Sequence, residues 1–142
     1  MIRKYIYGTP FDTEAVVSCL PGESGAPAYG EISTQEGFSF TYTMDEDDIV
    51  YGLGEANRGI NKRGYCYVSS CSDDPNHTED KRSLYAAHNF IVLAGKKPFG
   101  LFFDYPSTLT FDVGYTKMDT LKVFCEGTDL NLYVIDGDSP YD

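Results

Sequence analysis

The sequence predicts an all-β protein that folds as an antiparallel β-sandwich in a single domain. Short apolar or alternating runs recur about every 8–12 residues and are separated by turn residues, which is the spacing of sandwich strands. The composition includes 12 Tyr and 9 Phe, and both residue types favour strands. No segment longer than one turn has helical periodicity, and residues 78–88, the best helix candidate, are interpreted as a loop. A chain of 142 residues is long enough to bury one core.

The first third of the chain contains two predicted strands around a long loop. Residues 5–7 form a short edge strand, closed by Gly-Thr-Pro. Residues 20–30 contain three Gly and two Pro, a density that neither a helix nor a central strand tolerates. Residues 38–44 alternate large side chains with hydroxyl side chains, so a period of two places the two kinds on opposite faces of a strand.

A run of acids and a pair of glycines follow. The four acids at 45–48 are interpreted as a solvated turn, because calcium loops space their ligands and turn at a glycine. The strand at 49–51 is predicted to end in a bend at Gly52 and Gly54, since glycine turns a strand sharply. A polar loop comes next, and a new strand occupies 65–68.

The second half of the chain is more regular. Apolar or alternating runs are each closed by Gly, Pro or Asp, as in successive strands of a sandwich. Ser139 directly precedes Pro140, which is a helix start signal and predicts a domain boundary there. The strands predicted in this half lie at 90–94, 99–103, 109–111, 121–125 and 130–134.

Charge and composition exclude several classes of partner. The chain has 11 basic and 22 acidic residues and a net charge of −11, which opposes binding to nucleic acids or anionic membranes. No run approaches the roughly 18–20 apolar residues of a membrane span, and residues 1–12 do not resemble a signal peptide. The four cysteines are irregularly spaced and are predicted to be free thiols. We therefore expect a soluble, cytoplasmic protein.

No residue pattern predicts a cofactor, a metal ion or a catalytic group in this segment. His77 and Cys71 lie near two acids, but their spacing matches no standard zinc site. The glycines at 52 and 54 are not followed by a helix and a phosphate-binding Lys. Asp73 and Asp74 are adjacent, so in an extended segment their side chains point in opposite directions and form a poor catalytic pair.

Three groups of residues carry a resemblance to a known family. The groups are Tyr51 to Glu55 with Asn61 to Gly64, then Asp73 to Pro75 with Leu84 and Tyr85, then Phe99 to Asp104 with Asp129 to Ile135, Gly137 and Pro140. Their order and spacing over residues 38–140 resemble the amino-terminal domain of glycoside hydrolase family 31, the α-glucosidase and α-xylosidase family.

The resemblance implies a galactose-mutarotase-like supersandwich in residues 1–142, truncated before a helix and a catalytic (β/α)8 barrel. It implies a retaining glycosidase that hydrolyses terminal α-glucosidic bonds with two aspartates on that barrel. Residues 1–142 are then a noncatalytic domain, inactive alone. Its partners are the barrel and, in the full-length enzyme, an α-linked oligosaccharide. Glucose and xylose specificity both stay open.

The resemblance also implies a substrate-binding residue, Asp73. In the family, a loop of this domain reaches the mouth of the active site, and an Asp on it bonds to sugar hydroxyls. Asp73 and Pro75 match that loop, whereas the family's preceding Trp and Asn are absent. The alternative is that Asp73 only caps a turn before Pro75. Glu55 and Arg63 are expected to hold the two polar loops together, with an ion pair between them.

Two other functions stay open from the residues alone. A stand-alone carbohydrate-binding module would bind sugar without a barrel, but such modules often expose Trp, and the chain has none. A sugar epimerase of the mutarotase type has a similar sandwich. It relies on paired histidines and a Glu base, and His77 and His88 are the only histidines here.

Overall fold

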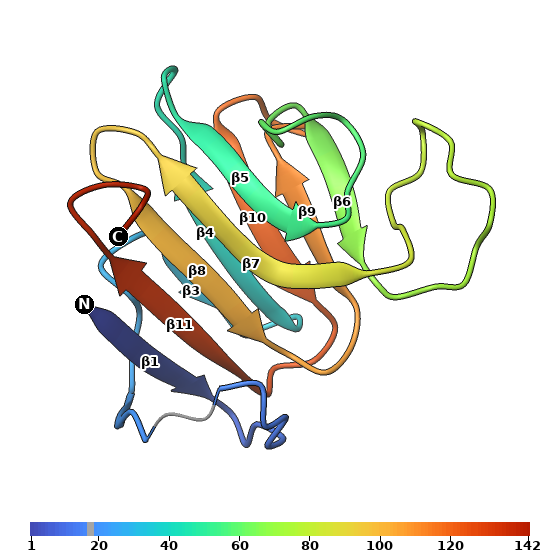
Figure 1. The fold of residues 1–142 in the computed structure, drawn as a ribbon. Helices are drawn as coiled ribbons and strands as arrows, with labels where there is room; N and C mark the ends of the chain where they lie inside the picture. The colour runs from blue at the N-terminus through green and yellow to red at the C-terminus, as the bar shows by residue number, and fades with distance from the viewer. Residues whose placement is uncertain (17–18) are drawn as a thin grey trace.

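The computed structural model describes residues 1–16 and 19–142 and shows two β-sheets packed face to face (Figure 1). One sheet has the strand order β2-β1-β11-β8-β7-β5 and the other β3-β4-β10-β9-β6. The described residues contain no helix, and the predicted antiparallel β-sandwich is confirmed. The strands are β1 (Ile2–Tyr7), β2 (Gly22–Glu23), β3 (Glu31–Ser33), β4 (Phe38–Thr43), β5 (Ile49–Gly54), β6 (Tyr65–Ser69), β7 (Ala87–Ala94), β8 (Phe99–Asp104), β9 (Leu109–Val113), β10 (Thr120–Cys125) and β11 (Leu130–Asp136).

Strand pairing follows the alternation of side chains in the sequence. Every pair of neighbouring strands is antiparallel except β1 and β2. In β10, Leu121 and Val123 are buried, whereas Lys122 and Phe124 between and after them are exposed. A slip of one residue would exchange the two sets, so burial of one face fixes the register.

The core between the sheets is centred on aromatic rings. Phe103 of β8 has no exposed surface. Its ring centroid lies 6.2 Å from that of Phe38, 6.0 Å from that of Phe40 and 5.7 Å from that of Phe111. These three residues belong to β4 and β9 of the opposite sheet, and all three rings meet Phe103 edge to face, a favourable aromatic geometry. Phe103 therefore joins the two sheets across the core.

Strand β5 is longer than the predicted strand at 49–51 and ends at Gly54, the second of the two glycines. It continues to Gly54 because its partner β7 keeps pairing with it, from Ile91 opposite Gly52 to Ala87 opposite Gly54. The register shifts between these two positions, and Leu53 between them has a φ of 68°. The glycines thus make a bulge that bends a continuing strand.

Replacing Gly52 by alanine is expected to destabilise the sandwich strongly. Its φ is +123°, and an added Cβ would lie 2.2 Å from the carbonyl oxygen of Phe90 on β7. The backbone conformation alone costs about 1–3 kcal/mol for a residue with a side chain, and the clash adds to this. Gly64→Ala is a matched control, because Gly64 has a φ of +92° but open space around it. Urea unfolding should show a larger loss of unfolding free energy for Gly52→Ala, and equal losses would contradict the clash.

Other elements also differ from the sequence prediction. β2 lies inside the loop predicted at 20–30 and pairs with β1, so β1 is not the outermost strand of its sheet. β3 is too short to show alternation, and its pairing with β4 defines it. Ser139 to Asp142 form one turn, with the Asp142 N–H donating to the Ser139 carbonyl at 3.2 Å.

The acidic turn at 45–48 is only partly solvated. Asp45, Glu46 and Asp47 are exposed, as predicted, but Asp48 is only 5% exposed. The Asp48 carboxylate accepts hydrogen bonds from the Asp45 N–H at 2.9 Å and from the Tyr42 hydroxyl at 3.3 Å. Burial, followed by the Asp48 charge and hydrogen bond, raises the pKa of Tyr42 to about 12. The fourth acid is therefore the cap that closes this turn.

The outer faces of the two sheets differ in character. The five-stranded sheet turns Ser39, Thr41 and Lys122 outward, together with one exposed ring, Phe124. The six-stranded sheet instead carries apolar side chains, and the register places Phe90 beside Phe102, and Phe102 beside Tyr133. Its outward apolar residues are Ile2, Ile6, Tyr51, Phe90, Val92, Phe102, Tyr133 and Ile135, and the polar residues Lys4, Asp104 and Asn131 share this face. The solvated face of an antiparallel sheet usually carries polar residues. The largely apolar outer face of the six-stranded sheet is therefore unusual.

Candidate functional site

The connection between β6 and β7, residues 70–86, extends away from the sandwich as a loop (Figure 1). Its first residues are short and polar, and Pro75 interrupts them, so the segment has no apolar face to bury. Residues 75–80 are all exposed. A rigid sandwich thus presents one projecting polar loop, and Asp73 lies on it.

The structure gives the two neighbouring aspartates of this loop different roles. Asp74 forms an ion pair with Lys81, and its carboxylate accepts a hydrogen bond from the Asn76 N–H at 3.0 Å across Pro75. The hydrogen bond from Lys81, followed by that from the Asn76 amide, lowers the pKa of Asp74. Asp73 is exposed and forms no hydrogen bond or ion pair with any other described residue. The turn cap is therefore Asp74, and the carboxylate of Asp73 is free to accept other donors.

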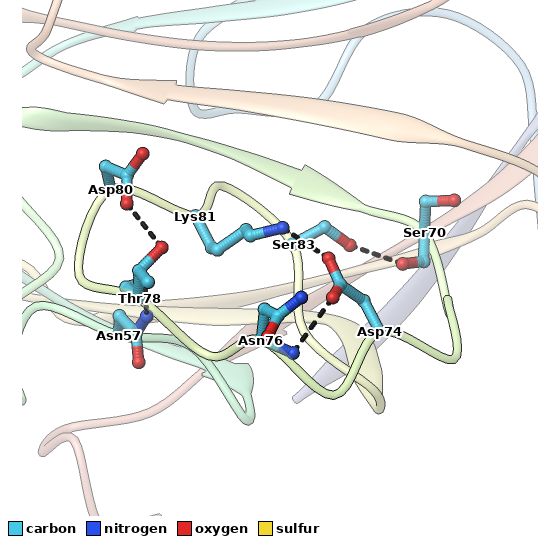
Figure 2. A network of polar contacts seen from close by, with 8 residues as sticks. All are labelled: Asn57, Ser70, Asp74, Asn76, Thr78, Asp80, Lys81 and Ser83. Atoms are coloured by element: carbon cyan, nitrogen blue, oxygen red, sulfur yellow. Dashed lines mark hydrogen bonds and ion pairs between the residues drawn. The ribbon is translucent and has the colours of Figure 1, made fainter.

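Bonds within the loop hold its two limbs together (Figure 2). The Ser83 hydroxyl donates to the Ser70 carbonyl, and Thr78 donates to Asp80. At the base, the Val68 N–H of β6 donates to the carbonyl of Arg82 at 2.8 Å. Together with the ion pair between Asp74 and Lys81, these bonds give a projecting loop a defined shape.

The loop after β5, residues 55–60, supports the 70–86 loop. The side-chain amide of Asn57 donates to the Thr78 carbonyl at 2.8 Å. Lys62 is only 5% exposed, and its ammonium donates to the carbonyls of Ala56 at 3.0 Å, Asn57 at 3.3 Å and Gly59 at 2.7 Å. The joint between the two polar loops is thus made by Asn57 and Lys62.

The expected ion pair between Glu55 and Arg63 is absent from the described residues, so that prediction was wrong. Arg63 instead binds backbone carbonyls of two other turns. Its guanidinium donates to the carbonyls of Asp45 at 2.6 Å and Asp48 at 3.1 Å, and to that of Met118 at 3.2 Å. Carbonyl acceptors leave no trace in side-chain patterns, which is why the sequence paired Arg63 with the nearest acid.

Sequence reasoning missed Lys62 and Asn57. The one available signal is a Lys placed between two strands in the run from Asn61 to Gly64, and it does not reveal burial. Lys is almost never buried without a partner, so only the folded loop, which supplies the carbonyls, accounts for Lys62.

The described residues do not assemble a catalytic or metal centre. No group of three His, Cys, Asp or Glu among them could hold a metal ion. His77 lies on the exposed loop, whereas His88 lies on β7 beside Gly54. Asp74 is occupied by Lys81, so Asp73 and Asp74 do not face each other as a pair across a substrate.

A polar groove of about 320 Å³ lies beside the base of the 70–86 loop. Asn89 crosses it by accepting a hydrogen bond from the Ser69 hydroxyl and donating to the Tyr105 carbonyl at 3.3 Å. Cys71, which is exposed, also lines the groove. Other lining residues are Ser69, Ser70, Pro106, Ser107 and Thr108.

All four cysteines are free thiols. Cys19 and Cys71 are exposed, while Cys66 is half-buried and Cys125 is buried. Burial raises the pKa of both the Cys66 and Cys125 thiols, so these two are less nucleophilic than an ordinary cysteine. The part of the chain that the structure describes has no helix with the length and apolar character needed to cross a membrane.

Comparison with known proteins points to one family. The profile described as "Glycosyl hydrolase 31 N-terminal galactose mutarotase-like domain" matches residues 19–112. The α-xylosidase XylQ of Lactiplantibacillus pentosus is 29% identical over 98 residues, which cover 69% of this chain and 12% of XylQ.

Solved structures share the fold. A GH31 dextranase of Flavobacterium johnsoniae, complexed with isomaltotriose, superposes with a TM-score of 0.68 at 23% identity, over 75% of this chain and 13% of its own. The cycloalternan-forming enzyme of Listeria monocytogenes gives a TM-score of 0.63 at 22% identity, over 71% of this chain and 10% of its own. The cycloalternan-degrading enzyme of Trueperella pyogenes gives 0.64 at 19% identity, over 74% of this chain and 15% of its own.

Proposed function

The chain belongs to the family of glycosyl hydrolase 31 N-terminal galactose mutarotase-like domains, and we propose that it is the noncatalytic amino-terminal domain of a retaining α-glycosidase. In this role the 70–86 loop reaches the sugar pocket of a separate catalytic barrel. The chain spans 12% of the length of the curated relative that it matches, so most of the proposed enzyme is outside this sequence.

One observation carries the proposal: an unengaged carboxylate on a shaped, projecting loop. Asp73 is exposed, while its neighbour Asp74 is bound to Lys81 and the Asn76 amide. A carboxylate accepts hydrogen bonds through both oxygens, so Asp73 suits two adjacent hydroxyls of a sugar ring. Because the loop already has its own internal bonds, little ordering is needed when a sugar binds.

The noncatalytic part of the proposal follows from the requirements of glycoside hydrolysis. Retaining hydrolysis needs two carboxyl groups roughly 5–5.5 Å apart on either side of the bond. Asp73 has no free carboxylate partner beside it on the loop, since Asp74 is bound to Lys81. The cleaving acid and nucleophile are therefore assigned to the barrel.

The proposed substrate is an α-linked oligosaccharide, with terminal α-glucosidic bonds as the first class to test. Family membership supports a glycosidase, and the matched relative is named an α-xylosidase. The absence of Trp near Asp73 leaves an aromatic platform for the sugar unassigned. We also assign the protein to the cytoplasm, which four free thiols support.

The apolar outer face of the six-stranded sheet is proposed to pack on the barrel. The other sheet turns Ser39, Thr41 and Lys122 outward with one exposed ring, Phe124, whereas this sheet places several apolar side chains side by side, among them Ile2, which is 50% exposed, and Phe90, which is 37% exposed. An exposed apolar sheet face marks a contact surface. Alone in solution, the chain is then expected to self-associate more than its net charge of −11 suggests.

The purified chain is expected to be inactive on an aryl α-glucoside, because the proposed acid and nucleophile lie on the barrel. Release of the chromogenic phenol is the measurement, and buffer alone is the control. The same assay on the full-length protein is expected to show turnover with retention of anomeric configuration. Turnover by the chain alone would contradict the noncatalytic role. Tight binding of an oligosaccharide by the chain alone would instead indicate a stand-alone carbohydrate-binding module.

A further inference from the structure

Lys62 is a buried cation without an anionic partner. It is 5% exposed, and no carboxylate within the described parts of the chain lies at ion-pair distance from its ammonium. Burying an ammonium is costly unless its protons are hydrogen-bonded. The three carbonyls of Ala56, Asn57 and Gly59 supply those acceptors at 2.7 to 3.3 Å, and an ammonium has three protons to donate. The loop therefore satisfies the ammonium completely.

The backbone of the 55–60 loop is shaped for this task. Arg58 and Gly59 have φ values of 75° and 76°, and left-handed conformation costs energy in a residue with a side chain. Two such residues in sequence curl the loop so that its carbonyls converge on Lys62. The Arg58 guanidinium lies 4.1 Å above the ring of Tyr65, which holds the loop on its outer side.

The backbone of Lys62 is fixed to the sheets. Its N–H donates to the Val50 carbonyl of β5 at 2.8 Å, and its carbonyl accepts the Tyr67 hydroxyl of β6 at 3.0 Å. Burial lowers the pKa of Lys62. The backbone of Lys62 thus links the two sheets, and its ammonium binds the carbonyls of the 55–60 loop.

Asn57 connects Lys62 to the 70–86 loop. Its main-chain carbonyl is held by Lys62, and its side-chain amide donates to the Thr78 carbonyl at 2.8 Å. The Thr78 carbonyl also accepts the Lys81 N–H at 3.1 Å, and the Lys81 side chain forms the ion pair with Asp74, the residue that follows Asp73 (Figure 2). A continuous set of bonds therefore runs from the sheets to the loop of Asp73.

We propose that Lys62 is an internal cation that positions the Asp73 loop through Asn57. Three backbone carbonyls of the 55–60 loop hold the Lys62 ammonium, and the Asn57 side chain joins that loop to Thr78. Both are positioning residues rather than groups that touch a substrate. The structural link stands without a sugar, whereas its effect on substrate affinity rests on the proposed function of Asp73.

Hydrogen–deuterium exchange of the chain without sugar tests the structural link. Asn57→Ala is expected to speed exchange in residues 70–86 about 2- to 12-fold, the loss of one hydrogen bond, and to leave β8 and β11 unchanged. Lys62→Met is expected to speed exchange in 55–60 and in 70–86. Lys97→Met, at an exposed lysine, is the matched control and should change neither. If Asn57→Ala left the 70–86 loop unchanged, the proposal would be wrong even if Lys62→Met failed to fold.

Kinetics of the full-length enzyme test the consequence. Asn57→Ala is expected to raise KM about 2- to 12-fold with kcat unchanged, because it misplaces a binding group and leaves the barrel intact. In the double variant with Asp73→Ala, the Asn57 substitution should add nothing, since both act through one carboxylate. If the KM of the double variant rose by the product of the factors seen in the two single variants, the link between Asn57 and Asp73 would be wrong. A changed exchange rate together with an unaffected KM for both Asp73→Ala and Asn57→Ala would instead reject the sugar-binding role and keep the internal cation.

Discussion

Replacing Asp73 by alanine in the full-length glycosidase is expected to lower kcat/KM roughly 10- to 150-fold on an α-linked disaccharide. The figure follows from losing hydrogen bonds between a charged acceptor and sugar hydroxyls, which contribute about 1.5–3 kcal/mol. Folding should be unaffected, because Asp73 is exposed and forms no bond with any other described residue. Steady-state kinetics measure the first effect, and urea unfolding of the same variant measures the second.

The same loop offers controls for this experiment. Glu79 is also acidic and exposed, so Glu79→Ala removes a charge from the loop without removing Asp73 and should leave kcat/KM unchanged. Asp74→Asn weakens the pair with Lys81, and its expected effect is smaller than that of Asp73→Ala, acting through loop order. If Asp73→Ala and Glu79→Ala both kept wild-type kcat/KM, Asp73 would have no role in substrate binding.

Phe103→Ala is expected to cost about 3–5 kcal/mol of unfolding free energy, the cost of truncating a fully buried aromatic ring. Phe103 has no exposed surface and contacts rings from the opposite sheet within 6.2 Å. Domains of this size have only about 5–15 kcal/mol of stability, so the variant should unfold at much lower urea concentration. The transition midpoint and slope in urea give the measurement.

Phe102 is the matched control for the core. It is adjacent to Phe103 but points to the outer face of the same sheet, where it is half-buried beside Tyr133. Phe102→Ala should therefore cost clearly less than Phe103→Ala. In the full-length enzyme, the two variants should lose more similar amounts of unfolding free energy, because the barrel is proposed to cover Phe102. Equal costs in the isolated chain would show that the two faces are buried alike.

Neighbouring residues were sufficient to predict the fold class. Alternation with period two in Phe38 to Thr43 and in Thr120 to Cys125 requires one buried and one exposed face, and the structure has both. Residues 78–88 were interpreted as a loop, and residues 78–86 do belong to one, whereas β7 already begins at Ala87. The family resemblance, by contrast, came from three groups of residues whose order and spacing extend over residues 38–140.

Contacts between residues far apart in the sequence decided the features that local patterns could not predict. β3 and the continuation of β5 through Gly54 exist because β4 and β7 supply hydrogen bonds from elsewhere in the chain. Arg63 was predicted to pair with an acid, yet it binds carbonyls as far away as Met118.

In the candidate site, too, the sequence determined which residues are present, and the fold decided which of them meet. The sequence determined that two aspartates precede Pro75, and only the folded loop decided that Lys81 takes Asp74 and leaves Asp73 free. The sequence placed a lysine at position 62, and only the curled 55–60 loop made it a buried cation. The reason is physical: strand alternation is a property of consecutive residues, whereas the partner of a charge is whichever dipole or ion the fold brings within about 3 Å.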